Sequence, residues 1–264
     1  MTFVVKIGGA AGNLLDPVLT DLAARTDYVL VHGGSERVDR LGEALGRPSE
    51  YLTSPSGVVS RRSDAAHLEV VVMALSGTVQ TELVAGFARR GVRAVGLSGA
   101  DGGLLTARRK EGTRAVVDGR VLRVTDDLSG TIDRVNVDLL RAVQRLGAIP
   151  VVGPPAITPE GEVVNVDADR VAAEIAVAVG ADDLLLLTNV PGLLRDRSDP
   201  TSVIPSVARD RIEDALAVAQ GRMRKKVLAA RDALSGGVGR VVIAPSERPA
   251  PVTAALAGEG TVFA

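Results

Sequence analysis

The 264-residue chain has only four lysines, and three of them lie in segments that could bind a phosphate. Lys6 comes directly before a glycine pair at the end of an apolar run, and Lys225 and Lys226 lie near the start of a helical pattern. All other basic side chains are arginines, which are not interchangeable with lysine at a phosphate. These lysines are therefore candidates for phosphate chemistry.

Two glycine pairs follow apolar runs that read as strands. Gly8 and Gly9 come after Lys6-Ile7, and Gly33 and Gly34 come after His32. Glycines at the carboxyl end of a parallel strand let backbone N–H groups approach an anion closely. A tight turn explains either pair alone, whereas two pairs at adjacent strand ends could frame a phosphate. Neither matches a Walker A loop or G-x-G-x-x-G. We expect Ser35 to be the N-cap of the next helix.

Three polar residues, Asn165, Asp167 and Asp169, alternate with small apolar residues just before a helical pattern. A helix start needs only one such residue as its N-cap. The other two are therefore candidates for holding a polar group of a substrate and for orienting cations near a phosphate. The sequence does not match an EF-hand loop.

Four cations gather where another helix should begin, in Gly221–Val227. Positive charge at a helix N-terminus opposes the helix dipole, so structure alone would disfavour it. A bound polyphosphate would explain the cluster, and a solvated basic face is the alternative. The four are Arg222, Arg224, Lys225 and Lys226.

Short β-branched runs alternate with longer helical patterns, which predicts an α/β fold: a three-layer sandwich with an open, mainly parallel central sheet. The expected strands are Phe3–Ile7, Tyr28–His32, Ala94–Ser98, Ile149–Gly153, Leu184–Thr188 and Arg240–Ala244. The expected helices are Leu14–Arg25, Glu36–Leu45, Asp64–Arg89, Asp133–Leu146, Asp169–Val179, Asp210–Val218 and Arg222–Leu234.

Turn residues predict two hairpins and a division of the chain. Asp118-Gly119 separates two apolar runs, and Thr158–Gly161 separates two shorter ones. The segment Gly153–Asn165 is the expected boundary between an N-terminal lobe, 1–153, and a C-terminal lobe, 154–264.

Composition excludes several classes of function. The net charge of −1 gives no general reason to expect nucleic-acid binding. The absence of cysteine rules out disulfides and thiolate chemistry, and two histidines leave little room for a metal site or a triad. The short apolar start fits neither a signal peptide nor a membrane span, so we expect a cytoplasmic protein.

Seven motifs in the same order resemble the amino acid kinase family over essentially the whole chain. Within it, they are similar to the branch of acetylglutamate kinases and of kinases that act on amino-group carrier proteins such as LysW. The motifs are K-I-G-G at Lys6–Gly9, V-H-G-G at Val31–Gly34, S-R-R-S-D at Ser60–Asp64, V-G-L-S-G-A-D-G at Val95–Gly102, N-V-D-A-D at Asn165–Asp169, L-L-T-N-V-P-G-L at Leu186–Leu193 and G-R-M-R-K-K-V at Gly221–Val227.

The resemblance implies ATP-dependent phosphorylation of a side-chain carboxylate, with Lys6 and Lys226 beside the transferring phosphoryl group and Asp169 holding both lysines. It assigns backbone phosphate donors to Gly8, Gly9, Gly33 and Gly34, of which the last two also border the substrate. A carboxylate is already a nucleophile, so such a reaction rests on alignment and charge stabilisation rather than on a strong base.

The resemblance also implies separate substrate and nucleotide sites. Arg61 and Asn165 would bind the α-carboxylate of an acidic amino acid in the N-terminal lobe, which would also form the dimer. The C-terminal lobe would bind ATP, with Mg²⁺ held mainly by nucleotide phosphates and water rather than by protein ligands. The residues expected to border the nucleotide are Thr188, Asn189, Gly192, Leu193 and Met223.

The position of Arg61 after Ser60 is similar to the carrier-protein branch, which implies carrier-linked α-aminoadipate or glutamate as substrate. A basic rim of Arg61, Arg62, Arg108, Arg109 and Lys110 could attract a small acidic LysW-like carrier, unless these cations form ordinary surface ion pairs. The family more often has Thr at Ser63 and Asn at Asp167.

Two alternatives stay open for the function. One is an N-acetyl-L-glutamate kinase that acts on the free acid, and the other is a non-catalytic regulatory protein that keeps the fold. In each case the resemblance favours a homodimer, formed through the Asp64–Arg89 region.

Overall fold

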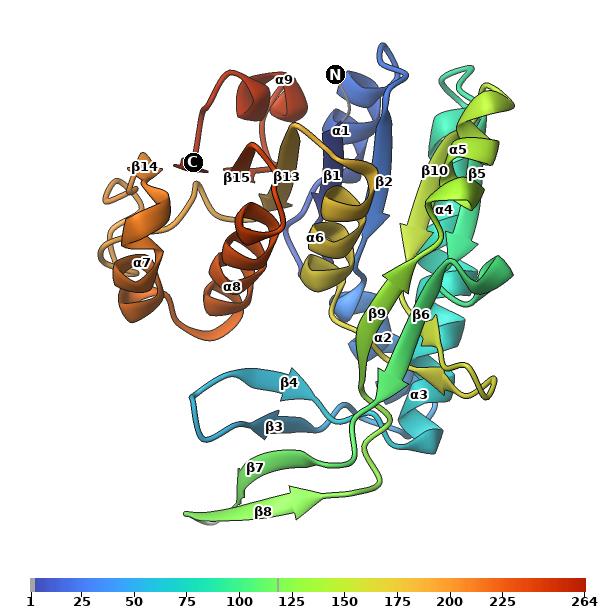
Figure 1. The fold of residues 1–264 in the computed structure, drawn as a ribbon, viewed down its shortest axis with the longest axis vertical. Coiled ribbons are helices and arrows are strands. Elements are labelled where there is room, and N and C mark those ends of the chain that lie inside the picture. The colour runs from blue at the N-terminus through green and yellow to red at the C-terminus, as the bar shows by residue number, and fades with distance from the viewer. Residues whose placement is uncertain (1–2, 118) are drawn as a thin grey trace.

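The computed structural model describes residues 3–117 and 119–264. Its centre is an eight-stranded sheet in the order β14-β16-β15-β13-β1-β2-β10-β5, in which only β16 runs antiparallel to a neighbour, β15 (Figure 1). The strands are β1 Phe3–Ile7, β2 Tyr28–His32, β5 Ala94–Ser98, β10 Ile149–Gly153, β13 Asp183–Thr188, β14 Ser206–Val207, β15 Arg240–Pro245 and β16 Thr261–Phe263.

Smaller sheets and hairpins extend from one end of the central sheet. A four-stranded sheet has the order β12-β11-β6-β9, and the hairpins β3–β4 and β7–β8 lie side by side at the bottom of Figure 1. The strands are β3 Tyr51–Thr53, β4 Val59–Arg61, β6 Leu105–Arg109, β7 Thr113–Val117, β8 Arg120–Val124, β9 Gly130–Val135, β11 Ala156–Ile157 and β12 Val163–Val164.

Helices cover both faces of the central sheet and give the three layers. The helices are α1 Leu15–Leu22, α2 Ser35–Ala44, α3 Ala65–Val72, α4 Gln80–Ala88, α5 Val137–Arg145, α6 Ala168–Val179, α7 Ile212–Val218, α8 Gly221–Ser235 and α9 Pro251–Leu256, with a π-helix η1 over Met73–Val79 and short 3₁₀ turns η2 Asp101–Gly103 and η3 Arg209–Arg211. One core lies under α5–α8, and the other lies under α1–α4 and α9.

Alternation along β1 decides which way its functional residue points. Val4 belongs to the core under α6 and α8, whereas Val5 and Ile7 belong to the opposite core. Successive side chains of a strand point to opposite faces, so Lys6 shares the face of Val4. The last residues of β1 therefore aim an ammonium group toward α6.

The structure confirms the predicted α/β fold and the six predicted strands. It also confirms the hairpin around residues 158–161, whereas Asp118 of the other predicted turn lies outside the described residues. One predicted element was wrong in part: residues 133–135 belong to strand β9, and helix α5 begins only at Val137. The β-branched run pairs with β6, and the side chain of Asn136 caps the helix by accepting a hydrogen bond from the Leu139 N–H.

The predicted division into lobes stays a prediction. The central sheet crosses the predicted boundary, because β1 of the predicted N-terminal lobe pairs with β13 of the predicted C-terminal lobe. Strands β11 and β12 follow the predicted boundary in sequence, yet β11 pairs with β6 of the first part. Residues up to about Asn165 thus pack with the N-terminal part of the chain.

The predicted long helix over Asp64–Arg89 forms as one helical run, α3-η1-α4, which the side chain of Asp64 caps. In the described part of the chain, this run is the one stretch that is long and apolar enough to cross a membrane, by length and composition alone. Half of its most apolar stretch is buried inside the protein, and core helices meet the same criteria. The cytoplasmic location stays a prediction.

Candidate active site

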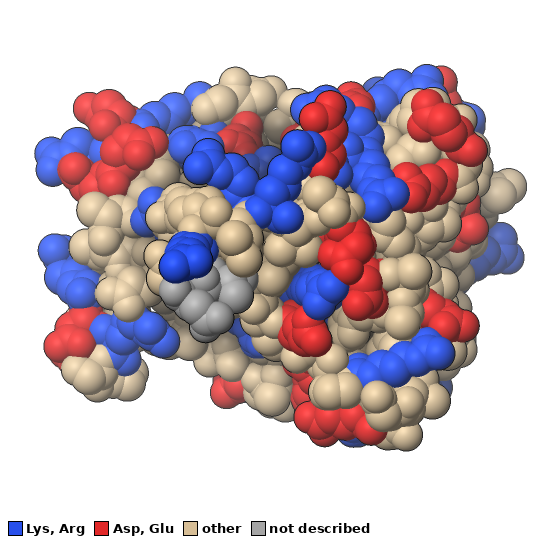
Figure 2. Space-filling model, turned by 90° about the horizontal axis from the view of Figure 1, so that it is seen from below, with Lys and Arg blue, Asp and Glu red and all other residues tan. Residues whose placement is uncertain are grey.

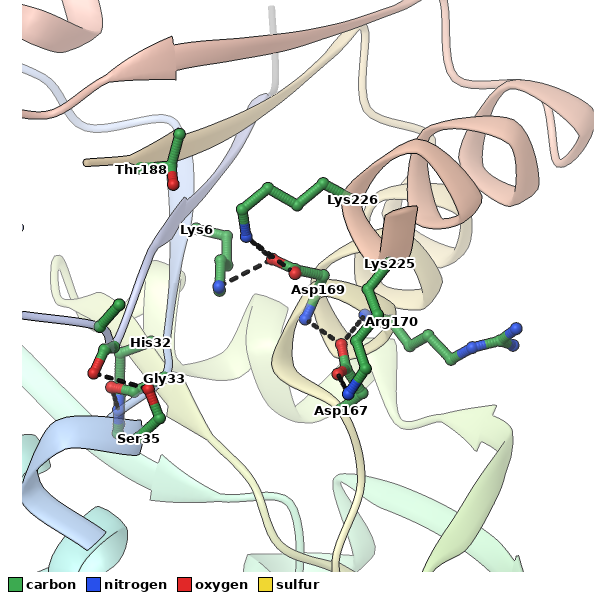
Figure 3. A network of polar contacts seen from close by, with 12 residues as sticks. Lys6, His32, Gly33, Ser35, Asp167, Asp169, Arg170, Thr188, Lys225 and Lys226 are labelled. Atoms are coloured by element: carbon green, nitrogen blue, oxygen red, sulfur yellow. Dashed lines mark hydrogen bonds and ion pairs between the residues drawn. The ribbon is translucent and has the colours of Figure 1, made fainter. Parts of the chain in front are cut away.

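Two lysines from distant parts of the chain share one buried carboxylate (Figure 3). The Lys6 ammonium lies 2.7 Å from Asp169 Oδ1, and the Lys226 ammonium lies 3.0 and 2.9 Å from the two oxygens of Asp169. Lys6 is the last residue but one of β1, Asp169 lies in the first turn of α6, and Lys226 lies in α8. The three side chains are 6–8% exposed. The structure thus brings together all three residues predicted to be catalytic.

The electrostatics of this triad favour a bound anion. Burial alone would raise the pKa of Asp169, but the charges of Lys226 and Lys6 and their hydrogen bonds hold it well below its usual range. Burial lowers the pKa of Lys226, Asp169 opposes that shift, and Lys6 adds to it. With all three groups charged, the triad carries one excess positive charge in a buried place. A buried charge is costly unless it is paired, so an anion is the complementary ligand.

The two glycine pairs lie against each other beside the triad. A Cβ atom on Gly9 would come within 2.0 Å of the Gly34 nitrogen, so no other residue fits there without moving the backbone. The Gly8 N–H donates to the Leu187 carbonyl, and the Gly33 N–H donates to the Ile7 carbonyl. In the described structure, the N–H groups of Gly9 and Gly34 make no such bond. The candidate phosphate donors therefore narrow from four glycines to these two.

Ser35 does not cap α2, contrary to the prediction. Helix α2 begins at Ser35 itself, and the Ser35 hydroxyl donates a 2.9 Å hydrogen bond to the Gly9 carbonyl. The Ser35 carbonyl in turn accepts a 3.2 Å bond from the Arg61 guanidinium. Ser35 thus connects the two glycine pairs to the predicted substrate-binding arginine.

Arg61 is held in place from several sides. Its guanidinium pairs with Asp39, donates to the Ser49 hydroxyl, and lies 5.1 Å from the centre of the Tyr51 ring. Its side chain is only 10% exposed. An arginine fixed in this way presents its remaining N–H groups in one direction, which suits recognition of a planar carboxylate.

Asn165 is held by a residue that is far away in sequence. Its amide donates a 2.8 Å hydrogen bond to the Ser63 hydroxyl, and the Ser63 N–H donates 2.9 Å to the buried Asp127 carboxylate. The same carboxylate accepts a hydrogen bond from the Thr113 hydroxyl. Ser63, where the family more often has Thr, therefore lies between the predicted substrate ligand and a buried acceptor.

Four of the five residues predicted to border the nucleotide lie at and after the end of β13, and the fifth, Met223, lies in α8. Thr188 ends that strand and is buried, and the Asn189 amide donates a 2.9 Å bond to the Ala11 carbonyl in the loop after the first glycine pair. Gly192 leaves room for Thr261, whose hydroxyl accepts from the Leu193 N–H. This loop is therefore tied to the loop that follows β1.

Two predicted nucleotide contacts differ from the rest. The Leu193 side chain is 1% exposed and belongs to the core, so it can border a nucleotide only through its backbone. Met223 is half-buried at the start of α8 and packs on the edge of the same core.

Four of the five cations of the predicted basic rim already have carboxylate partners. Figure 2 shows basic and acidic side chains interleaved over the face that carries the hairpins. Of the five, Lys110 alone makes no ion pair with residues 3–117 or 119–264. The pairs are Arg61 with Asp39, Arg62 with Glu50 and Asp126, Arg108 with Asp133, and Arg109 with Glu162.

Sequence reasoning missed several residues that support the site. Asp39 lies one helical turn after Ser35, a spacing that could have indicated a shared helix face. The sequence around Asp127 does not indicate its role, because Ser63, whose N–H it binds, is 64 residues away. Lys225 was predicted only as one of the cations of Gly221–Val227 that could bind a phosphate, and its ion pair with Asp167 was not predicted.

No group of three or more His, Asp or Glu side chains in the described part of the chain is arranged to hold a metal ion.

The model of the amino acid kinase family matches residues 1–245. The chain belongs to this family. A [LysW]-aminoadipate kinase of Deinococcus radiodurans is 46% identical over 263 residues, which cover 98% of this chain and 90% of that protein. The kinase of the same name from Thermus thermophilus is 43% identical and covers 98% of both chains. A putative [LysW]-aminoadipate/[LysW]-glutamate kinase of Pyrococcus abyssi is 39% identical, covering 91% of this chain and 95% of that one.

Solved structures share the fold. The protein smu.665 of Streptococcus mutans matches with a TM-score of 0.79 at 23% identity, covering 99% of this chain and 98% of that chain. An N-acetylglutamate synthase of Neisseria gonorrhoeae, solved with coenzyme A and N-acetyl-glutamate, matches with a TM-score of 0.79 at 27% identity. The match covers all of this chain and 59% of that one. Membership of the family confirms the predicted fold and the predicted class of enzyme, a phosphotransferase, and it implies ATP as the phosphoryl donor.

Proposed function

We propose that this kinase phosphorylates the side-chain carboxylate of an acidic amino acid, α-aminoadipate or glutamate, whose amino group is linked to a small acidic carrier protein. The observation that carries the kinase assignment is the buried Lys6–Asp169–Lys226 triad. The activities after which the relatives are named support the carrier-linked substrate.

The triad is suited to stabilising charge on a phosphoryl group in transfer. Asp169 fixes both ammonium groups before any substrate binds, so their charge is already oriented. In a buried site such fixed charges act more strongly than in water. We assign Lys6 and Lys226 to the two sides of the transferring group, and we assign Asp169 to positioning them.

No general base is required for the reaction. The substrate carboxylate is ionised at neutral pH and can attack the γ-phosphorus of ATP directly, giving an acyl phosphate and ADP. Consistent with this, the nearby His32 is buried, which lowers its pKa to about 4 and keeps its imidazole neutral. The free N–H groups of Gly9 and Gly34 would donate to oxygens of the phosphoryl group, and Gly33 would border the substrate.

The substrate would be oriented by Arg61 and Asn165. Arg61 is fixed by Asp39, and Asn165 is fixed by Ser63, so each presents a defined set of donors. Both are connected to the phosphate end of the site, Arg61 through Ser35 and Asn165 through the loop that begins α6. An α-carboxylate at this position would place the side-chain carboxylate toward the triad.

ATP would bind along the ends of β13 and α8. We assign this role to Thr188, Asn189, Gly192, the backbone of Leu193 and Met223, within the C-terminal lobe. Mg²⁺ would arrive with the nucleotide, held mainly by its phosphates and by water, and would supply charge neutralisation during transfer.

The carrier would dock on the face of the two hairpins. All four rim arginines are paired with carboxylates, which reduces the net positive charge that this rim offers. Lys110, which makes no ion pair with the described residues, and the exposed side chains of Val121 and Leu122, which point to opposite faces of β8, would provide cationic and apolar contacts around the hairpins. Electrostatic attraction there would raise the rate of encounter with an acidic carrier more than the final affinity.

We also propose a homodimer formed through the Asp64–Arg89 region, whose helical run exposes the large apolar side chain of Met73. Light scattering on the purified protein tests the dimer, and a Met73→Lys variant that becomes monomeric would locate its interface.

An ATP-dependent hydroxamate assay tests the function. Hydroxylamine traps acyl phosphates, so carrier-linked α-aminoadipate, carrier-linked glutamate and free N-acetylglutamate can be compared under one set of conditions. We expect kcat/KM for one carrier-linked acid to exceed that for the free acid by roughly 100-fold or more, the scale set by the lost docking contacts. A carrier loaded with alanine, which has no side-chain carboxylate, is the control.

The other possible results of the hydroxamate assay would each indicate a different function. Turnover of the free acid alone would replace the proposal with an N-acetylglutamate kinase. No turnover of any acid would indicate a non-catalytic binding protein.

A further inference from the structure

Asp167 forms an ion pair that lies next to the triad but is not part of it. Its Oδ2 accepts a 3.1 Å hydrogen bond from the Lys225 ammonium (Figure 3). We propose that the Asp167–Lys225 pair positions Lys226 for phosphoryl transfer, an inference that rests on the proposed function. Asp167 and Lys225 are positioning residues rather than catalytic ones, because nothing places them against the reacting atoms.

The geometry links two short segments at two points. Asp167 and Asp169 lie at the start of α6, and Lys225 and Lys226 are consecutive residues near the start of α8. Consecutive residues of a helix point about 100° apart, so two bonds from them restrain rotation of the helix as well as its distance. Asp167–Lys225 and Asp169–Lys226 are therefore two independent connections between these helix ends.

The helix cap does not explain the negative charge of Asp167. Its Oδ1 accepts hydrogen bonds from the N–H groups of Asp169, at 2.9 Å, and Arg170, at 3.4 Å, which completes the cap. An asparagine caps a helix as well as an aspartate does. Among the described residues, the second oxygen pairs directly only with Lys225, so capping and pairing can be separated by one substitution.

The pairing also removes a competitor for Asp169. Four cations crowd the first turns of α8, where the helix dipole disfavours them. Asp167 gives the Lys225 ammonium its own acceptor, so Lys6 and Lys226 share Asp169 without a third cation. Of the two lysines of α8, it is then always Lys226, not Lys225, that presents its ammonium group to the phosphoryl group.

The same two helices supply a matched control. Arg170 of α6 pairs with Asp232 of α8 at 3.4 Å, about two turns further along α8. Both pairs are partly exposed. The side chains of Arg170 and Asp232 are 50% and 29% exposed, and those of Asp167 and Lys225 are 31% and 23% exposed. Breaking the Arg170–Asp232 pair tests general packing of α6 on α8 without touching the cap or the lysine pair.

Steady-state kinetics on the full chain test the proposal. We expect Asp167→Asn and Lys225→Met each to lower kcat about 5-fold, the upper limit for partly exposed ion pairs, with KM for ATP within about 2-fold. The double variant should lose no more than either single one, and Lys225→Arg should keep at least about half of kcat because it can still pair. Asp232→Asn should match the wild type.

A second readout does not depend on the substrate. Because the chain has four lysines, labelling lysine Nζ with ¹⁵N gives few NMR signals, and Lys226 can be titrated directly. Asp167 favours the charged form of Lys226, so Asp167→Asn should lower the pKa of Lys226 further, whereas Asp232→Asn should not. An unchanged Lys226 titration in Asp167→Asn, or equal losses of kcat in Asp167→Asn and Asp232→Asn, would overturn the proposal. Failure of the proposed function would appear instead as a wild type inactive on every acid, with the Lys226 titration still informative.

Discussion

The buried triad and the exposed hairpin rim contain the same kinds of charged group in opposite surroundings. In the triad, two ammonium groups share one carboxylate, and their side chains are 6–8% exposed. In the rim, Arg108 and Arg109 each pair with one carboxylate, and their side chains are 69% and 36% exposed. The triad therefore has an excess of positive charge that water cannot screen, whereas the charges of Arg108 and Arg109 are paired and solvated, and the attraction of the rim for an acidic carrier rests on Lys110.

The difference shows why an ion pair by itself says little about function. Exposed pairs contribute about 0.2–1 kcal/mol, so the rim neither holds the fold together nor demands a ligand. A buried group of unbalanced charge is costly, and it persists where a ligand supplies the missing charge. We therefore expect every substitution in the triad to lower activity or stability, and we expect most substitutions in the rim to change both only slightly.

The largest effect should come from removing the carboxylate at the centre of the triad. Asp169→Asn leaves two buried ammonium groups without their counterion, so we expect kcat to fall at least about 1,000-fold and the free energy of unfolding to fall by about 3 kcal/mol. Hydroxamate kinetics and urea denaturation measure the two effects. Asp133→Asn, which breaks a rim pair, is the control, and equal losses in both variants would remove the distinction between the regions.

Replacing either triad lysine with arginine should reduce activity with less effect on stability. Arg keeps the charge but not the compact ammonium that fits beside Asp169, so Lys226→Arg and Lys6→Arg should each lower kcat by roughly 100- to 1,000-fold. Circular dichroism confirms folding, and nucleotide binding by calorimetry separates binding from transfer. Near-normal turnover in both variants would contradict the roles assigned to the lysines.

Stability should depend on pH through the buried His32. His32 is buried between Gln80 and the Gly33 carbonyl, and burial lowers its pKa to about 4 from 6.5. The unfolded chain then binds more protons between pH 6.5 and 4, so stability falls as the pH falls through this range, by about 3 kcal/mol from His32. Thermal melts of the wild type and His32→Gln across this range should converge at low pH. Parallel curves would show that His32 does not titrate differently on folding.

The smallest effect should come from the rim. Arg108→Gln and Arg109→Gln should change the free energy of unfolding by less than about 0.5 kcal/mol and should raise KM for the carrier-linked acid by only about 2- to 5-fold. Added salt should raise the same KM in the wild type, while kcat at saturation stays unchanged. Equal salt sensitivity of the free acid and the carrier-linked acid would argue against docking on this face.

Local sequence predicted the central sheet well, because its strands are buried on both faces. The run Phe3–Ile7 has no polar face apart from Lys6, and such a run followed by a glycine pair is typical of a parallel strand. The lysines and glycines at these strand ends could be found for the same reason, since parallel strands bring their carboxyl ends to one edge.

The elements that the sequence did not reveal are short or depend on distant partners. Strands β3 and β4 have three residues each and are mostly exposed, so they carry little periodic signal. The pairing of Arg61 with Asp39 and of Asn165 with Ser63 arises only when hairpin and helix meet. Ser35 was predicted to be a cap because its type and position fit, but α2 begins at Ser35 itself, and its hydroxyl donates to the Gly9 carbonyl instead of accepting from a backbone N–H of the helix.

The fate of the carboxylate oxygen tests most directly that the triad transfers phosphate to a side-chain carboxylate. The carrier-linked acid is labelled with ¹⁸O in its side-chain carboxylate, incubated with ATP, and cleaved with hydroxylamine, which attacks the acyl carbon and releases phosphate with the bridging oxygen. We expect each phosphate formed by the wild type to contain one ¹⁸O, visible as an isotope shift in ³¹P NMR, and Lys226→Arg to form such phosphate far more slowly. Phosphate without ¹⁸O would show that water, not the carboxylate, receives the phosphoryl group, and would contradict the proposed reaction.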